Sequence, residues 1–348
     1  MTEIGRLLTA MVTPFDEKGE VDYEQAKRLA LALVASGSDG VVVAGTTGES
    51  PTLTPEEQKR LFTEVKGVLK GKGVVIAGTG SNSTAEAVHY TEDAQEAGAD
   101  GCLLVVPYYN KPTQEGLYQH FKTIAGHTDL PCILYNVPSR TITNLSAETT
   151  VRLSGVKNIV GVKEASADFG QIGTIIRETD KGFKVWSGND ADTFFIMWMG
   201  GYGVVSVASH LVGKQIKGMM NMVLDGAVSG AAKEHLRMLP LSQGLFVVAN
   251  PIPVKYCVNK AGFNVGAPRL PLNEPDEKTA KSLDELMSKY EVDLPAEMSR
   301  HYSEAREEAE DLAVVQRRAN EEAIPWSEAK TKAVAKGRRI SPHVRAKS

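Results

Sequence analysis

The stretch IVGVKEA, residues 159–165, is a short apolar run that carries a lysine near its end. Its apolar residues follow one another without the polar alternation of a half-buried strand, which indicates a strand buried on both faces, as in parallel sheets. A free ammonium group is costly to desolvate. Lys163 therefore either reaches water, or burial lowers its pKa and makes the amine a nucleophile that can form a Schiff base with a ketone.

Apolar, β-branched runs like this one recur at near-regular intervals. With residues 159–162 they make a set of eight, the others being 7–12, 40–45, 74–78, 102–106, 132–135, 184–186 and 204–207. Segments with apolar residues at helical spacing separate them, as at 21–36 and 55–69. Eight strand–helix units by about residue 225 predict the α/β class and a (β/α)8 TIM barrel. A doubly wound open sheet is the alternative, and the even spacing favours closure.

The composition changes twice after the predicted barrel of residues 1–225. Residues 226–294 read as a C-terminal helical appendix, and the helices expected from Leu211 onward are 214–224, 230–238, 242–248, 253–261 and 276–290. Residues 295–348 form a charged, helix-prone extension whose last nineteen residues include no acid. A basic tail of this kind can bind an acidic partner, which the sequence does not identify. A solvated, partly disordered terminus is the alternative.

Composition limits the classes of function. The chain has 348 residues and a formal net charge of −4, so the barrel has no electrostatic reason to bind nucleic acid. No apolar run approaches the ~20 residues that span a bilayer, and no signal-peptide pattern precedes the first strand. Cys102 and Cys132 fall in apolar runs, so we expect buried thiols in a reducing cytoplasm rather than a disulfide. The chain has no HExxH, CxxC or histidine-cluster motif, and we expect no metal.

Chemistry in a (β/α)8 barrel lies at the carboxyl ends of the strands, so the residues that follow each strand are candidates. GTTGES, residues 45–50, follows the second strand. The hydroxyls of Thr46 and Thr47, together with N–H groups exposed by glycine, suit a carboxylate. The alternative is a tight turn whose threonines cap the following helix.

Tyrosines follow the fourth and fifth strands. PYYNKP, residues 107–112, is a stiff aromatic loop that packs either against a partner subunit or within the chain. YNVPSRT, residues 135–141, places Tyr135 one strand before Lys163, so its phenol can carry protons for the amine. Arg140 offers a guanidinium fork to a carboxylate. A packing tyrosine and a surface arginine are the alternatives.

The seventh strand is followed by SGND, residues 187–190. Gly188 has no side chain to keep a substrate from the backbone. Asp190 and Asp192 are expected to cap a helix rather than to bind a metal.

From about residue 4 to residue 294 the chain resembles the dihydrodipicolinate synthase family of pyruvate-dependent class I aldolases. The resemblance rests on residues 45–50, on 107–112 with EGLYQHF at 115–121, on 135–141, and on GVKEAS at 161–166. Arg140 after Asn-Val-Pro-Ser points to the synthases rather than to the related sialic acid lyases.

The resemblance implies an activity and roles for single residues. Lys163 would form an imine with pyruvate, and the enamine made from it would attack aspartate-4-semialdehyde in lysine and diaminopimelate biosynthesis, with no metal or organic cofactor. Thr46 and Thr47 would hold the pyruvate carboxylate. Tyr135, Thr46 and Tyr109 would relay protons, with Tyr109 reaching in from the neighbouring subunit of a homotetramer built as a dimer of dimers.

The resemblance also implies groups around the centre and an effector site. Arg140 would bind the semialdehyde carboxylate, and Gly188 and Val205 would offer backbone groups. Some family members are inhibited by lysine at a dimer interface, and the residues that match that site here are Ser50, Asn82, Glu86 and Tyr108. Pro55 and Gln58 replace the histidines of one lysine-sensitive type, so the sequence leaves feedback by lysine open.

Two other functions remain as alternatives. One is a related aldolase that cleaves 2-keto-3-deoxy sugar acids or sialic acid. The other is an interaction scaffold that works through the charged extension.

Overall fold

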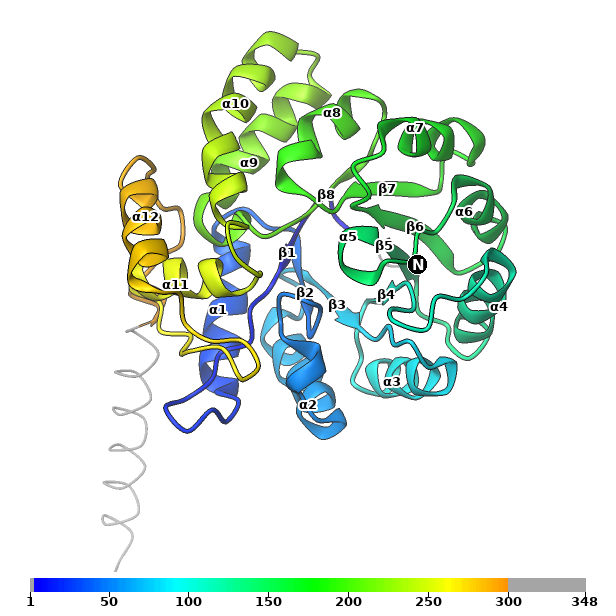
Figure 1. The fold of residues 1–348 in the computed structure, drawn as a ribbon, viewed down its shortest axis with the longest axis horizontal. Coiled ribbons are helices and arrows are strands. Elements are labelled where there is room, and N and C mark those ends of the chain that lie inside the picture. Colours follow the sequence, from blue (N-terminus) through cyan, green and yellow to red (C-terminus); the bar gives the residue numbers. More distant parts are fainter. Residues whose placement is uncertain (1–2, 300–348) are drawn as a thin grey trace, which may run out of the picture. The chain divides into compact units, whose positions relative to one another are not determined.

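The computed structural model describes residues 3–299. Eight parallel strands form a closed barrel in chain order, β1 to β8, with helices around the outside (Figure 1). The strands are β1 (Leu7–Ala10), β2 (Gly40–Val43), β3 (Val74–Gly78), β4 (Gly101–Val105), β5 (Cys132–Asn136), β6 (Ile159–Glu164), β7 (Lys184–Ser187) and β8 (Gly203–Ser206). The predicted (β/α)8 barrel is confirmed, the open sheet is wrong, and each predicted strand ends within two residues of an observed one.

Helices connect and follow the strands. Around the barrel they are α1 (Tyr23–Ala35), α2 (Pro55–Leu69), α3 (Thr84–Glu96), α4 (Gln114–Ala125), α5 (Pro138–Thr141), α6 (Ala147–Ser154), α7 (Phe169–Glu178), α8 (Thr193–Trp198) and α9 (Ser209–Leu224), with short 3-10 turns η1 (Ser50–Thr52) and η2 (Asp190–Asp192). After the barrel come α10 (Val228–Gly244), α11 (Ile252–Lys260) and α12 (Glu277–Met287). None of the helices between residues 3 and 299 combines the length and the hydropathy needed to cross a bilayer.

One predicted break in the helical region is wrong. The sequence predicts separate helices over 230–238 and 242–248, but one helix, α10, runs from Val228 through Pro240 to Gly244 and leaves residues 245–248 outside it. A proline inside a helix removes one backbone hydrogen bond. The buried side chains of Ala231, Met238 and Leu241 lie on both sides of it, and their packing holds the helix together across the missing bond.

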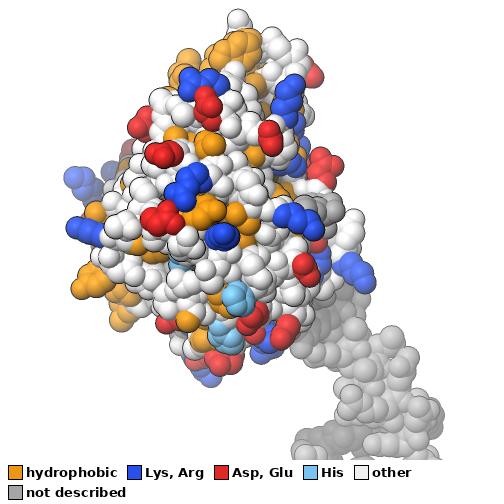
Figure 2. Space-filling model, turned by 90° about the vertical axis from the view of Figure 1, so that its right-hand side faces the viewer, with side chains coloured by type: hydrophobic (Ala, Val, Ile, Leu, Met, Phe, Trp, Pro, Cys, Tyr) orange, Lys and Arg blue, Asp and Glu red, His pale blue; other side chains and the backbone are white. Residues whose placement is uncertain are grey.

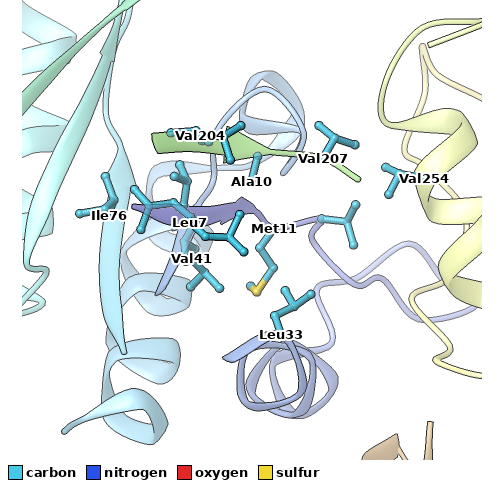
Figure 3. Close-up of a cluster of buried hydrophobic side chains, with 14 of the residues drawn as sticks. Leu7, Ala10, Met11, Leu33, Val41, Ile76, Val204, Val207 and Val254 are labelled. Carbon is cyan, nitrogen blue, oxygen red and sulfur yellow. The ribbon is translucent and has the colours of Figure 1, made fainter. Parts of the chain in front are cut away.

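The strands are buried as the continuous apolar runs indicated. β1 and β2 are buried at every position, and Figure 3 shows side chains of β1, β2 and β8 gathered in one apolar cluster with Leu33 of α1. Cys102 and Cys132 are free and buried, as predicted. Residues 3–299 fall in one compact unit. The division at residue 225 remains a prediction, and most of the extension 295–348 lies outside the described residues.

The outer surface is mixed in charge. On the side of the molecule drawn in Figure 2, basic and acidic side chains are interspersed among polar and apolar ones. The strands inside run in the same direction, so their carboxyl ends meet at one end of the barrel. The candidate residues of the sequence are therefore brought to this end.

Gly161 offers a test of how tightly β6 is packed. A Cβ at this position would lie 2.2 Å from the carbonyl oxygen of Lys184 and 2.7 Å from the ring of Trp186. We expect Gly161→Ala to lower the free energy of unfolding by about 3 kcal/mol, because a methyl group there overpacks two strands. Gly173 in α7 is the matched control, since a Cβ there meets nothing within 4 Å. Gly173→Ala should raise stability by about 0.5–1 kcal/mol.

Urea unfolding of both variants measures these two changes. Equal stability of the two variants would contradict the close packing of β6 against β7.

Candidate active site

A cavity of about 370 Å³ opens at the carboxyl end of the barrel. Six residues predicted from the sequence line it: Thr46, Thr47, Tyr135, Arg140, Lys163 and Gly188. They come from the ends of β2, β5, β6 and β7 and from the one-turn helix α5. The structure thus brings together most of the predicted constellation.

Lys163 lies on β6 in register with Tyr135 of β5. Lys163 is 6% exposed, and its Nζ lies 4.1 Å from the centre of the Tyr135 ring. Burial lowers the pKa of Lys163 to about 7, with Asp190 raising it and Arg140 lowering it further. About half of the amine is therefore uncharged at pH 7, compared with about one molecule in 2500 for an ordinary lysine. This amine can act as a nucleophile without a separate base to deprotonate it.

Tyr135 is buried beside that amine. Burial raises the pKa of its phenol to about 12, with Arg140 and a side-chain hydrogen bond from Thr46 lowering it. The phenol is therefore protonated at neutral pH, and the Thr46 hydroxyl is its hydrogen-bond partner. This arrangement lets a proton pass between Tyr135 and Thr46 next to the amine.

The Thr46–Thr47 turn follows β2 as predicted, and it does not cap the next helix. The N-cap of α2 is Thr54, which forms a capping box with Glu57. The N–H of Glu49 donates to the carbonyl of Thr46 over 3.1 Å, which closes the turn. The hydroxyl of Thr47 is left at the cavity wall, where it accepts a hydrogen bond of 2.8 Å from Asn250.

Arg140 and Gly188 both line the cavity. Arg140 lies on α5 and has no ion pair with any residue from 3 to 299, so its guanidinium group is available to an anion. Gly188 lies against the lysine, because a Cβ there would be 3.2 Å from Cε of Lys163 and 2.6 Å from Cβ of Ala165. A larger residue at position 188 would clash with Ala165 and crowd the Lys163 side chain.

Two predicted residues are not brought to this cavity. Tyr109 is 88% exposed and lies in a left-handed conformation, φ +72°, away from the cavity wall. Val205 is buried within β8, and Val207, two residues further along, is the one that lines the cavity. The single chain therefore gives no contact between Tyr109 and the amine.

The residues matched to an effector site lie around a neighbouring cavity of about 410 Å³. Ser50, Glu86 and Tyr108 line it, and so does Gln58. Asn82 is not part of its wall, and its side chain donates to the carbonyl of Tyr108 over 3.2 Å. This cavity shares Thr46 and Arg140 with the one that holds the amine.

Asp190 does not cap a helix, contrary to the prediction. Its buried carboxylate accepts hydrogen bonds from the hydroxyl of Ser206 and from the N–H groups of Val207 and Ala208, just ahead of α9. Asp192 stands at the N-cap position of α8 without a capping bond. Within residues 3–299, no three His, Cys, Asp or Glu side chains are grouped as metal ligands would be.

The sequence did not point to the part of the wall that comes from the C-terminal region. Asn250 precedes α11 and reaches Thr47 across 203 positions of sequence. The Oδ1 atom of Asn250 is buried and has no hydrogen-bond partner within the described residues. Nothing in the residues around Asn250 signals this contact, since it depends on how the last helices pack on the barrel.

Comparisons with known proteins show which family the chain belongs to. The model of the dihydrodipicolinate synthetase family matches residues 3–290. A 4-hydroxy-tetrahydrodipicolinate synthase of Dehalococcoides mccartyi is 60% identical over 295 residues, which cover 85% of this chain and 99% of the relative. One from Symbiobacterium thermophilum is 52% identical over 289 residues, 83% of this chain and 98% of the relative.

A solved structure is similar to this chain over most of its length. The dihydrodipicolinate synthase of Bacillus anthracis has a TM-score of 0.82 and 43% identity, and the match covers 83% of this chain and 99% of that one. A family model that spans nearly the whole described chain and relatives of this identity leave one conclusion. The chain belongs to the dihydrodipicolinate synthetase family.

Proposed function

We propose that this chain is a lyase with 4-hydroxy-tetrahydrodipicolinate synthase activity, which condenses pyruvate with aspartate-4-semialdehyde and closes the ring. The observation that carries the proposal is the buried amine of Lys163, with a pKa lowered to about 7, next to the Tyr135 phenol. The curated relatives with this name are 60% and 52% identical to the chain, and they support the same activity. The reaction belongs to lysine and diaminopimelate biosynthesis, and we place it in the cytoplasm.

The first half of the reaction makes the carbon nucleophile. The neutral Nζ of Lys163 attacks the keto carbon of pyruvate and gives a carbinolamine. Tyr135 delivers a proton to the hydroxyl, which leaves as water, and an iminium remains on the lysine. The iminium draws electrons from the methyl group, which loses a proton to the Tyr135 phenolate and becomes the terminal carbon of an enamine. The imine itself is the electron sink, so these steps require neither a metal nor an organic cofactor.

The second half joins the two substrates and frees the enzyme. The enamine carbon attacks the aldehyde carbon of the semialdehyde, whose oxygen takes a proton. The amino group of the semialdehyde then attacks the imine carbon and closes the ring. The Tyr135–Thr46 relay takes a proton from this amino group and passes it to Nζ, the bond from the carbon to Nζ breaks, and the Lys163 amine leaves.

The remaining side chains orient the substrates. Thr46 and Thr47 hold the pyruvate carboxylate, and the unpaired guanidinium of Arg140 binds the semialdehyde carboxylate as a bidentate ion pair. Gly188 leaves room for the adduct. Tyr109 completes the relay in a neighbouring subunit of a homotetramer, a role that its 88% exposure in the single chain supports.

Borohydride trapping with pyruvate tests the proposal. We expect a pyruvate-derived adduct on Lys163 by mass spectrometry, and no adduct in Lys163→Ala. Lys255, which is also buried, is the internal control and should stay unmodified. Trapping on another lysine, or no ring product from pyruvate and aspartate-4-semialdehyde, would refute the proposal. Turnover of sialic acid or 2-keto-3-deoxy sugar acids in its place would favour the related aldolase.

The pH dependence of trapping reports the charge of the amine. Because the pKa of Lys163 is lowered to about 7, the reactive neutral form is abundant above pH 7. Its share falls about tenfold for each pH unit below that value. The initial rate of adduct formation should therefore rise with pH and level off above about 7.5. A rate that keeps rising to pH 10 would show that the amine has the pKa of an ordinary exposed lysine.

Arg140→Ala tests whether Arg140 binds aspartate-4-semialdehyde and not pyruvate. Loss of a charge-assisted pair is worth about 1.5–3 kcal/mol, so the KM for aspartate-4-semialdehyde should rise about 10–100-fold, while the pyruvate concentration for half-maximal trapping stays the same. Because the charge of Arg140 also lowers the pKa of Lys163, the trapping profile should move to higher pH. Arg177→Ala, which changes an exposed arginine of α7, is the control. An unchanged KM in Arg140→Ala would remove Arg140 from the substrate site.

A further inference from the structure

The reaction above leaves a second buried lysine unused. Lys255 lies on α11 and is 1% exposed. Its three ammonium protons go to the carboxylate of Glu49 over 2.9 Å and to the carbonyls of Thr13 and Ala267 over 3.0 Å each. The amine has no free proton or open approach, so Lys255 is not a nucleophile. A buried charge with this many partners fixes the groups around it.

The partner, Glu49, closes the GTTGE turn in an unusual backbone conformation. Its φ is +59°, in the left-handed region that residues other than glycine rarely occupy. Its side chain is buried, and the second carboxylate oxygen accepts the N–H of Arg269 over 2.9 Å. Such a conformation costs about 1–3 kcal/mol and persists only where the surroundings impose it. Here the surroundings are Lys255 and the backbone of Arg269.

The same turn is held at two further points. The hydroxyl of Thr13, three residues after β1, donates to the carbonyl of Gly48 over 2.6 Å, and Asn250 donates to the hydroxyl of Thr47 over 2.8 Å. Asn250 and Lys255 both belong to the C-terminal region, at and just before α11. The helices that follow the barrel therefore hold the turn in position together with β2.

We propose that Lys255 and Glu49 are positioning residues for pyruvate: their buried ion pair holds the Thr46–Thr47 turn where its hydroxyls meet the carboxylate of the Lys163 adduct. The inference rests on the proposed function, which assigns that carboxylate to the two threonines. It makes α11 part of the active-site framework. Removal of the pair should weaken capture of pyruvate without changing the chemistry of the amine.

The test measures adduct formation by borohydride trapping over a range of pyruvate concentrations. The variants are Lys255→Met and the double variant Lys255→Met/Glu49→Gln, with Lys260→Met as the control. Lys260 is on the same helix in an exposed pair with Asp284. Lys255→Met leaves a buried carboxylate without its partner and should be less stable, whereas the double variant buries no charge and recovers stability. The double variant therefore decides the question if Lys255→Met does not fold.

A positioning role and a purely structural role give different results. If the pair positions the turn, the pyruvate concentration for half-maximal trapping rises about tenfold in both variants, since a small misplacement is costly, and the pH profile keeps its inflection near that of the wild type. The control stays at the wild-type value. If the pair only stabilises the fold, the maximum amount of adduct falls and the half-maximal concentration does not move, which overturns the inference. If the wild-type protein forms no adduct, the proposed function is refuted, and this inference is refuted with it.

Discussion

The burial of one amine at the end of a closed barrel governs the arrangement of this site. Burial lowers the pKa of Lys163 from 10.5 to about 7, so the charged form is disfavoured by about 5 kcal/mol. The attraction of Asp190 is too small to offset this, because Asp190 is held by Ser206 and by the backbone ahead of α9. Without a carboxylate in direct contact, the amine is free to react. Gly188 and the close pairing of β5 with β6 then fix where it lies.

The two buried lysines show how surroundings decide the role of the same side chain. Lys163 has the face of the Tyr135 ring and an open cavity beside it, and it loses its proton near neutral pH. Lys255 has three oxygen acceptors, one of them the carboxylate of Glu49. Its pKa is lowered only to about 8, again by burial, with Glu49 opposing the shift. At pH 7 most of Lys255 keeps its charge, which suits a residue that holds a turn in place.

The features that were predicted from the sequence follow from local patterns of residues. Continuous apolar runs identified all eight strands, and the rule that chemistry follows the carboxyl ends of barrel strands then selected Thr46, Tyr135, Lys163 and Gly188. The missed features depend on packing between distant segments. Asn250 meets Thr47 only after the C-terminal helices pack on the barrel, and Val207, one residue past the end of β8, joins the cavity wall. Pro240 remained inside α10 because tertiary contacts outweighed the local signal to stop.

A crystal structure of the protein grown with pyruvate would test the central claim most directly. The account predicts continuous electron density from Nζ of Lys163 to the keto carbon of pyruvate, with the carboxylate on the hydroxyls of Thr46 and Thr47 and the Tyr135 hydroxyl within hydrogen-bonding distance of the adduct. A Lys163 side chain without attached density, while pyruvate is bound elsewhere or joined to another lysine, would contradict it.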